Sequence, residues 1–127
     1  MPPTCFFEKK SFNRFRNKIK QYPGIALFLD FDGTLVPIQK DPSRCVLSGE
    51  MKEELKSLAD SNCCYLTILS GRSLPDIKGM VGIRNICYSG NHGLVISGSD
   101  MTYVHPGVLS ARPLIRRLVC LVMRLQV

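Results

Sequence analysis

The sequence lacks a long apolar segment and any pair of cysteines at metal-binding spacing. Near the start, the longest apolar run is residues 25–29, which is stopped by Asp30. That run is too short for the roughly 20 residues that span a bilayer, and it does not fit a secretory signal. Six cysteines are present, but Cys63 and Cys64 are adjacent and none forms a C-x-x-C motif. We therefore expect reduced, mostly buried thiols in a soluble, cytoplasmic protein.

Acidic residues are few, with 10 against 17 basic ones, and the formal net charge is +7. The excess of positive charge lies near the two ends of the chain. A solvated helix face at each end explains this pattern, and a nucleic-acid or membrane-surface patch is the alternative. No recognised nucleic-acid-binding signature accompanies the charge, so we expect neither nucleic acid nor a membrane as a partner. The basic residues concerned are Lys9, Lys10, Arg14, Arg16, Lys18, Lys20, Arg112, Arg116, Arg117 and Arg124.

The chain also has no internal repeat and no low-complexity segment, and 45% hydrophobic residues are enough for one folded domain. Short apolar runs alternate with helical patterns, which predicts an α/β fold with a parallel sheet. The run at 25–29 is typical of a central strand buried on both faces. Strands are predicted at 25–29, 64–69 and 86–88, and helices at 11–21, after Ser48, after Ser73 and beyond Pro113. A loop or small hairpin is predicted at 37–48, and a hairpin at 94–104.

Two acidic residues follow the first strand in the segment Asp30-Phe31-Asp32-Gly33-Thr34. Residues two apart on an extended chain point to the same side, so we expect Asp30 and Asp32 to face one pocket while Phe31 packs inside. Such a pair requires a cation or a shared proton, and Mg²⁺ fits oxygen ligands. One carboxylate would then attack phosphorus while the other transfers protons. Gly33 allows a sharp turn and Thr34 offers a hydroxyl. A plain polar turn after a strand is the alternative.

The segment from Leu27 to Leu35 resembles the first motif of the haloacid dehalogenase superfamily. The resemblance implies that Asp30 is the nucleophile and Asp32 the general acid and base. It also implies that Asp30 and the backbone carbonyl of Asp32 bind Mg²⁺. The second motif of that superfamily is a Ser or Thr after the next strand, and Ser70, in Ser70-Gly71-Arg72, takes that place.

Within the superfamily, the chain is similar to the trehalose-phosphatase family from about Pro23 onward. The similarity rests on Ser70-Gly71-Arg72-Ser73-Leu74, on Tyr88-Ser89-Gly90-Asn91-His92-Gly93-Leu94 and on His105-Pro106. It implies that Gly33, Thr34, Ser70, Gly71 and Arg72 bind phosphate or substrate. Asn91 and His92 either contact substrate or fix the turn after the third strand.

Helical spacing near the start, together with the resemblance from Pro23 onward, predicts how the chain is organised. A basic amphipathic helix at 1–22 precedes a Rossmann-like, three-layer core at 23–112, which is incomplete, and 113–127 begins a cap domain. Related enzymes also use a later Lys and a later acidic pair, yet no Lys follows Lys78 and no acidic residue follows Val104. We therefore expect a truncated form whose activity alone is doubtful.

The leading functional hypothesis is a Mg²⁺-dependent phosphatase that hydrolyses trehalose 6-phosphate through an aspartyl phosphate. Alternatives are a phosphatase for another sugar phosphate, or a non-catalytic fragment that binds sugar phosphate or a partner chain. A basic nucleic-acid binder is the weakest alternative. The oligomeric state is left open by the sequence.

Overall fold

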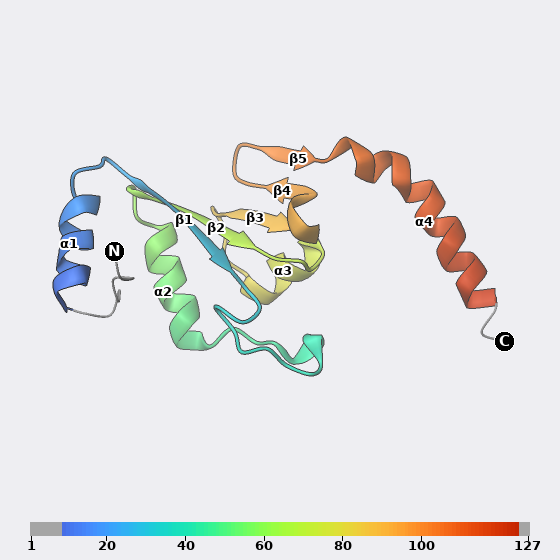
Figure 1. The fold of residues 1–127 in the computed structure, drawn as a ribbon, viewed down its shortest axis with the longest axis horizontal. Coiled ribbons are helices and arrows are strands. Elements are labelled where there is room, and N and C mark those ends of the chain that lie inside the picture. Colours follow the sequence, from blue (N-terminus) through green and yellow to red (C-terminus); the bar gives the residue numbers. More distant parts are fainter. Residues whose placement is uncertain (1–8, 125–127) are drawn as a thin grey trace, which may run out of the picture.

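The computed structural model describes residues 9–124, which form a five-stranded sheet with helices on one face and a helix at each end (Figure 1). Two short 3₁₀ turns, η1 at Pro42–Arg44 and η2 at Asn91–Gly93, lie in the connections. The other elements are α1 Lys9–Ile19, β1 Ile25–Asp30, α2 Gly49–Ala59, β2 Cys64–Leu69, α3 Leu74–Val81, β3 Cys87–Gly90, β4 Val95–Ser97, β5 Thr102–Val104 and α4 Pro106–Arg124.

The sheet has the order β1-β2-β3-β4-β5, which confirms the predicted α/β class. β1, β2 and β3 are parallel to one another, and the predicted hairpin adds β4 and β5 in antiparallel orientation. The register pairs Asp30 with Leu69 and Leu69 with Ser89, so the carboxyl ends of the three parallel strands lie at one edge. The prediction of a central first strand is wrong for the described residues, since β1 is the edge strand.

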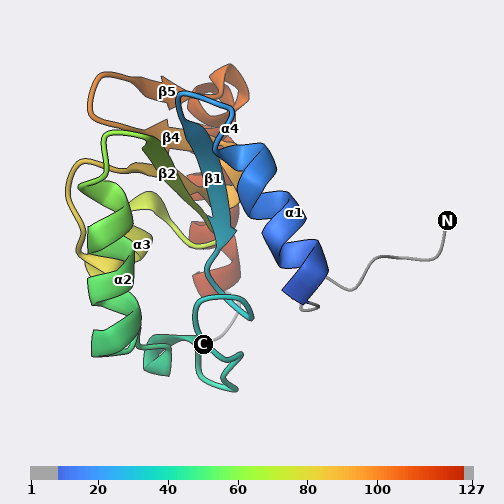
Figure 2. The ribbon, with the colours of Figure 1, turned by 90° about the vertical axis from the view of Figure 1, so that its left-hand side faces the viewer.

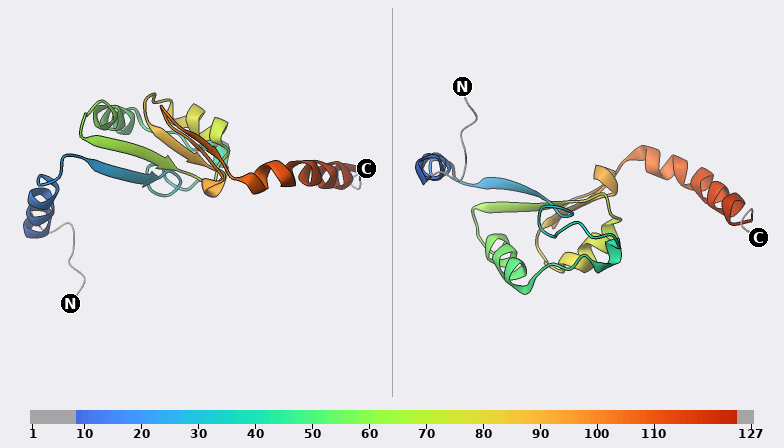
Figure 3. Two further views of the ribbon diagram at one scale, coloured as in Figure 1. Left: turned by 90° about the horizontal axis from the view of Figure 1, so that it is seen from above. Right: turned by 60° about the horizontal axis from the view of Figure 1, so that its bottom comes forward.

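Helices α2 and α3 pack on the same face of the sheet, as the two views in Figure 3 show. Their starts follow from sequence, because the Ser48 and Ser73 hydroxyls accept hydrogen bonds from Met51 N and Asp76 N. The core between helices and sheet contains the fully buried Phe31, Leu55, Ile68, Ile77 and Val81.

The other face of the sheet is open across β1 and β2. Phe28 is 62% exposed and Tyr65 is 71% exposed. The expectation of a first strand buried on both faces is therefore not met within residues 9–124. The physical reason is that α2 and α3 both pack on the opposite face, where Leu27 and Leu29 lie against the core.

The terminal helices extend away from the sheet, α4 most clearly (Figures 1 and 2). The prediction that the last helix begins at Pro113 is wrong, because α4 begins at Pro106 and Pro113 lies inside it. Pro106 suits the first turn of a helix, where the N–H has no partner within the helix. Pro113 has no N–H to donate to the preceding turn, but that turn is exposed and water can solvate its free carbonyl group. The division of the chain at 112/113 stays a prediction. None of the helices in the described part is both long and apolar enough to cross a membrane.

The described cysteines are all free thiols, and the expected reduced state stays a prediction. Only Cys45 and Cys64 among them are buried, so the prediction of mostly buried thiols is wrong. Cys5 lies outside the described residues. The expected cytoplasmic location stays a prediction.

Candidate functional site

The end of β1 turns sharply after its first acidic residue. Asp30 is the last residue of the strand, Phe31 is fully buried, and Gly33 has a φ of 91°, in the left-handed region that favours glycine. Gly33 N donates to Val36 O at 2.8 Å and closes the turn. The Asp30 carboxylate is exposed and accepts a hydrogen bond from the Thr34 hydroxyl at 3.4 Å. The strand therefore presents Asp30 to solvent at the ligand-binding edge of the sheet.

Asp32, in contrast, is held by Arg72 from the loop after β2. Arg72 Nε donates to one carboxylate oxygen at 2.9 Å, and its Nη2 donates to the other at 2.6 Å. The guanidinium also lies over the Phe31 ring, 5.8 Å from the ring centroid. The hydrogen bonds from Arg72 hold the pKa of Asp32 below its usual range, and the same pair raises the pKa of Arg72. The positive charge that balances the Asp32 carboxylate is thus supplied by the protein itself, by the Arg72 guanidinium.

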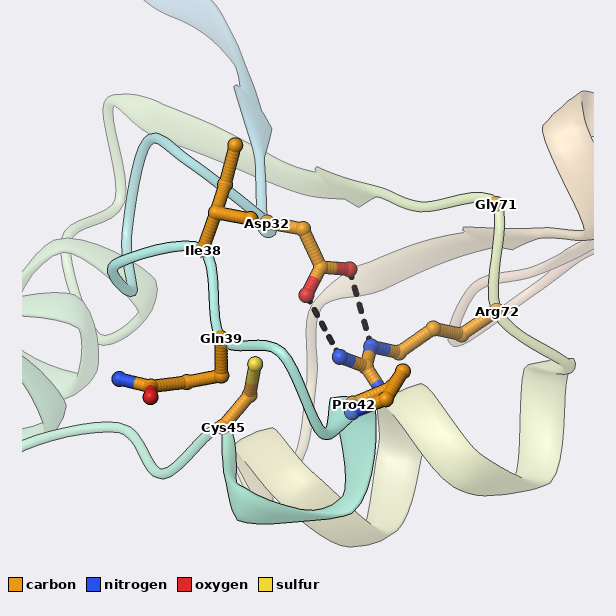
Figure 4. A pocket seen from close by; sticks show the side chains of 7 residues that line it. All are labelled: Asp32, Ile38, Gln39, Pro42, Cys45, Gly71 and Arg72. Atoms are coloured by element: carbon orange, nitrogen blue, oxygen red, sulfur yellow. Dashed lines mark hydrogen bonds and ion pairs between the residues drawn. The ribbon is translucent and has the colours of Figure 1, made fainter.

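A pocket of about 380 Å³ opens beside this ion pair (Figure 4). Asp32 points into it from the turn after β1, and Arg72 reaches the Asp32 carboxylate from across the pocket. Gly71 comes from the loop after β2, and the other walls come from the connection between β1 and α2, which the sequence predicted as a loop or small hairpin. The lining residues are Asp32, Ile38, Gln39, Pro42, Cys45, Gly71 and Arg72.

Ser70 lies directly after β2, where the sequence predicted it. It is 6% exposed, and its hydroxyl accepts a hydrogen bond from Arg72 N at 3.1 Å. That hydroxyl retains its own proton to donate to an anion. Ser70 N donates to Ser89 O at 2.9 Å, which ties the loop to β3.

Asn91 and His92 form the turn at the end of β3, with left-handed φ values of 52° and 56°. Asn91 N donates to Arg72 O at 2.7 Å, and His92 N donates to Ser70 O at 3.2 Å. The structure therefore places both residues against the loop 70–72. His105 is further along, where its Nδ1 accepts from Gly107 N at 3.1 Å at the start of α4.

The predicted residues thus gather at one edge of the sheet, although not all in one pocket. Asp32, Gly71 and Arg72 line the pocket of Figure 4, whereas Asp30 does not. The expectation that both carboxylates face one pocket stays a prediction. Sequence reasoning missed the Asp32–Arg72 pair, although the signal was there, since residues after adjacent parallel strands lie side by side. It also missed the contribution of Cys45, for which no signal exists.

The donor set at this edge fits a hard cation in part. Asp30 offers an exposed carboxylate, and oxygen donors are what Mg²⁺ prefers. The Asp32 carboxylate is engaged by Arg72, which leaves its backbone carbonyl as the group that the resemblance assigns to the metal. Residues 9–124 contain no group of three His, Cys, Asp or Glu side chains placed to hold a metal.

Comparison with known proteins gives consistent results. The model of the family described as trehalose-phosphatase matches residues 28–126. The chain is 40% identical over 76 residues to probable trehalose-phosphate phosphatase H of Arabidopsis thaliana, covering 60% of this chain and 21% of that protein.

Solved structures agree with the sequence comparison. The C-terminal domain of C. albicans trehalose-6-phosphate phosphatase superposes with a TM-score of 0.65 at 26% identity, covering 72% of this chain and 32% of that one. A haloacid dehalogenase-like hydrolase from B. subtilis shares the fold, with a TM-score of 0.50 at 24% identity over 63% of this chain and 27% of that one. The chain spans about a fifth of the Arabidopsis protein and about a third of the C. albicans domain.

Proposed function

The chain belongs to the trehalose-phosphatase family, and from that premise we propose that the end of its β1 strand carries the phosphoryl-transfer chemistry of trehalose 6-phosphate hydrolysis. The observation that carries the proposal is the position of Asp30. Its exposed carboxylate ends a strand whose parallel neighbour leads directly into Ser70, and Phe31 N donates to Leu69 O at 3.1 Å beside it. A nucleophile and a phosphate-binding hydroxyl therefore follow two neighbouring strands.

In the proposed reaction, the Asp30 carboxylate attacks phosphorus and the bond from phosphorus to the sugar oxygen breaks. Asp32 donates a proton to that leaving oxygen and later removes a proton from the water that hydrolyses the aspartyl phosphate. Ser70 donates its hydroxyl proton to a phosphate oxygen. Thr34 is close enough to Asp30 to orient its carboxylate.

Mg²⁺ would be held by the Asp30 carboxylate and the Asp32 backbone carbonyl. When bound, it would neutralise charge on the phosphate dianion. The chain's own contribution at this point is the turn closed by Gly33 N, which fixes the backbone that follows β1.

Substrate phosphate can compete with the Asp32 carboxylate for the Arg72 guanidinium. A guanidinium binds carboxylate and phosphate with the same two-pronged geometry, so an arriving phosphate dianion can take over one or both of its N–H donors. Release of Asp32 by Arg72 would free the carboxyl group to exchange protons. We propose that substrate phosphate and Asp32 share Arg72 in turn.

A second candidate function is binding of sugar phosphate without turnover. Two observations favour it: both Asp32 carboxylate oxygens are engaged by Arg72, and the described residues hold no three-ligand metal group. Under this hypothesis Arg72 and Ser70 bind the phosphate, and Asp30 is not phosphorylated.

Phosphate release with Mg²⁺ separates these functions. The purified chain is assayed on trehalose 6-phosphate, sucrose 6-phosphate and mannose 6-phosphate, with Asp30→Asn as the matched inactive control. Release that prefers trehalose 6-phosphate and is lost in the control supports the proposal. If calorimetry shows that sugar phosphate binds but no phosphate is released, the second candidate is supported. If another sugar phosphate is hydrolysed faster, that sugar phosphate becomes the proposed substrate.

A further inference from the structure

The imidazole of His92 occupies the space where a side chain at Gly71 would be. An ideal Cβ on Gly71 would lie 2.5 Å from Cε1, 2.8 Å from Nε2 and 3.2 Å from Nδ1 of His92. Gly71 is not among the residues with positive φ, so its backbone conformation does not require glycine. Glycine is required at position 71 because the His92 ring lies directly against the Gly71 backbone and leaves no room for a side chain.

Backbone hydrogen bonds attach the same turn to the same loop. His92 N donates to Ser70 O, and Asn91 N donates to Arg72 O, so they bracket Gly71 on both sides. Both donors belong to residues with left-handed φ, a conformation that is uncommon outside glycine. The turn after β3 therefore contacts the loop 70–72 through two backbone hydrogen bonds and the His92 ring.

The loop in turn places two groups of the candidate site. Ser70 is 6% exposed and its hydroxyl accepts from Arg72 N. The Arg72 guanidinium reaches Asp32, 40 residues earlier in the chain, through two hydrogen bonds. A shift of the loop backbone would move the phosphate-binding hydroxyl and the guanidinium together.

We propose that His92 is a positioning residue, whose ring holds the Ser70-Gly71-Arg72 loop so that the Arg72 guanidinium meets Asp32 and Ser70 meets the phosphate. The ring acts by filling space against Gly71, not by contacting substrate. The inference relies on the proposed function only for the reaction that the loop serves. The contacts between ring and loop hold whether or not the chain turns over substrate.

The test follows the Arg72 Nε–H resonance by NMR in the purified chain, with the Asp32→Asn variant defining the signal of a weakened pair. In His92→Ala we expect that resonance to move most of the way toward its position in Asp32→Asn, and inorganic phosphate to bind at least several-fold more weakly. In His92→Phe, which keeps a ring of similar shape but no N–H, we expect both to stay near wild type.

A substrate-contacting histidine predicts a different outcome. His92→Phe would then lose binding of trehalose 6-phosphate while the Arg72 resonance stays in place in every His92 variant. That result, or an unchanged Arg72 resonance in His92→Ala, would overturn the inference.

Paired substitutions test the steric contact itself. Gly71→Ala displaces the ring and should shift the Arg72 resonance as His92→Ala does. The Gly71→Ala, His92→Ala double variant should be no more perturbed than His92→Ala alone, because the methyl group then enters the space that the ring has left. Effects that simply add would contradict the contact.

Gly90→Ala is the matched control. An ideal Cβ at Gly90 would lie 2.7 Å from Leu74 N, 2.8 Å from Leu74 Cα and 3.1 Å from Arg72 O, so its two shortest clashes are with the backbone of α3 and not with the His92 ring. Adding His92→Ala to Gly90→Ala should therefore not relieve the clash of the new methyl group with Leu74. Because these readouts need no turnover, a chain without phosphatase activity would refute the proposed function and leave this inference to be judged separately.

Discussion

Asp30 and Asp32 are separated by one residue, yet their surroundings differ. Asp30 is exposed and contacts the Thr34 hydroxyl at 3.4 Å, whereas both carboxylate oxygens of Asp32 receive hydrogen bonds from Arg72 at 2.9 and 2.6 Å. An open carboxylate suits attack on phosphorus, whereas the held one would exchange protons once Arg72 releases it. The difference teaches that two carboxylates of the same residue type can acquire different surroundings, since Thr34 of the same turn lies beside Asp30 whereas Arg72 from the loop after β2 holds Asp32.

Replacement of the open carboxylate should have the largest effect. Asp30→Asn should reduce phosphate release to the background rate, because an amide oxygen does not form the acyl phosphate. The measurement is the initial rate on trehalose 6-phosphate with Mg²⁺. Retention of a comparable rate would break the assignment of the nucleophile.

Replacement of the held carboxylate should have a smaller effect. Asp32→Asn should slow turnover about 10²–10⁴-fold, the range for loss of a general acid and base. An activated substrate such as p-nitrophenyl phosphate should recover part of the loss, since its leaving group needs no proton. Equal losses on both substrates would argue against proton donation by Asp32.

The close backbone contact between Gly90 and Leu74 should affect stability. Gly90→Ala forces a Cβ against Leu74 N and Cα, and overpacking of this kind lowers the free energy of unfolding by about 1–3 kcal/mol. Urea unfolding followed by circular dichroism measures it. Gly79→Ala in α3 is the control, because its Cβ would meet nothing within 4 Å. Gly79→Ala should therefore be neutral or stabilising by up to about 1 kcal/mol.

The ion pair should give the smallest effect, visible in the pH dependence of stability. Arg72 lowers the folded-state pKa of Asp32 below the ordinary value of 3.8. The pair therefore stabilises the fold above about pH 3.8, and that contribution is lost as pH falls through the lowered pKa.

Arg72→Met is the variant that isolates this term. The difference in unfolding free energy between wild type and Arg72→Met should be about 1 kcal/mol or less, because solvent screens a pair of which the Asp32 side chain is 35% exposed. It should be constant near neutral pH and shrink in acid. A difference that grows below pH 3.8 would contradict the ion pair.

Local signals predicted much of this architecture. The apolar runs predicted β1 and β2, and Ser48 and Ser73 predicted the starts of α2 and α3. The turn residues Ser97-Gly98-Ser99-Asp100 predicted the β4–β5 hairpin. Each of these features is decided by residues close in sequence, through burial, capping or turn formation. The order Asp30, Ser70, Asn91 along the chain also predicted which strand ends carry the candidate site.

Features decided by distant contacts were not predicted. The Asp32–Arg72 pair joins residues 40 positions apart, and the ring of His92 against Gly71 depends on the left-handed turn after β3. Pro113 misled the placement of α4, because a proline read as a helix start lies inside an exposed helix. The exposure of Phe28 depends on what covers the second face of the sheet, which the strand's own residues do not specify.

Detection of a phosphoryl group on Asp30 is the most direct test of the account. The chain is mixed with trehalose 6-phosphate and Mg²⁺, quenched in acid within one turnover, digested and analysed by mass spectrometry. We predict one phosphoryl group on the peptide that contains Asp30, and none in Asp30→Asn. An unmodified Asp30 peptide while phosphate is released, or a phosphoryl group on another residue, would contradict the account.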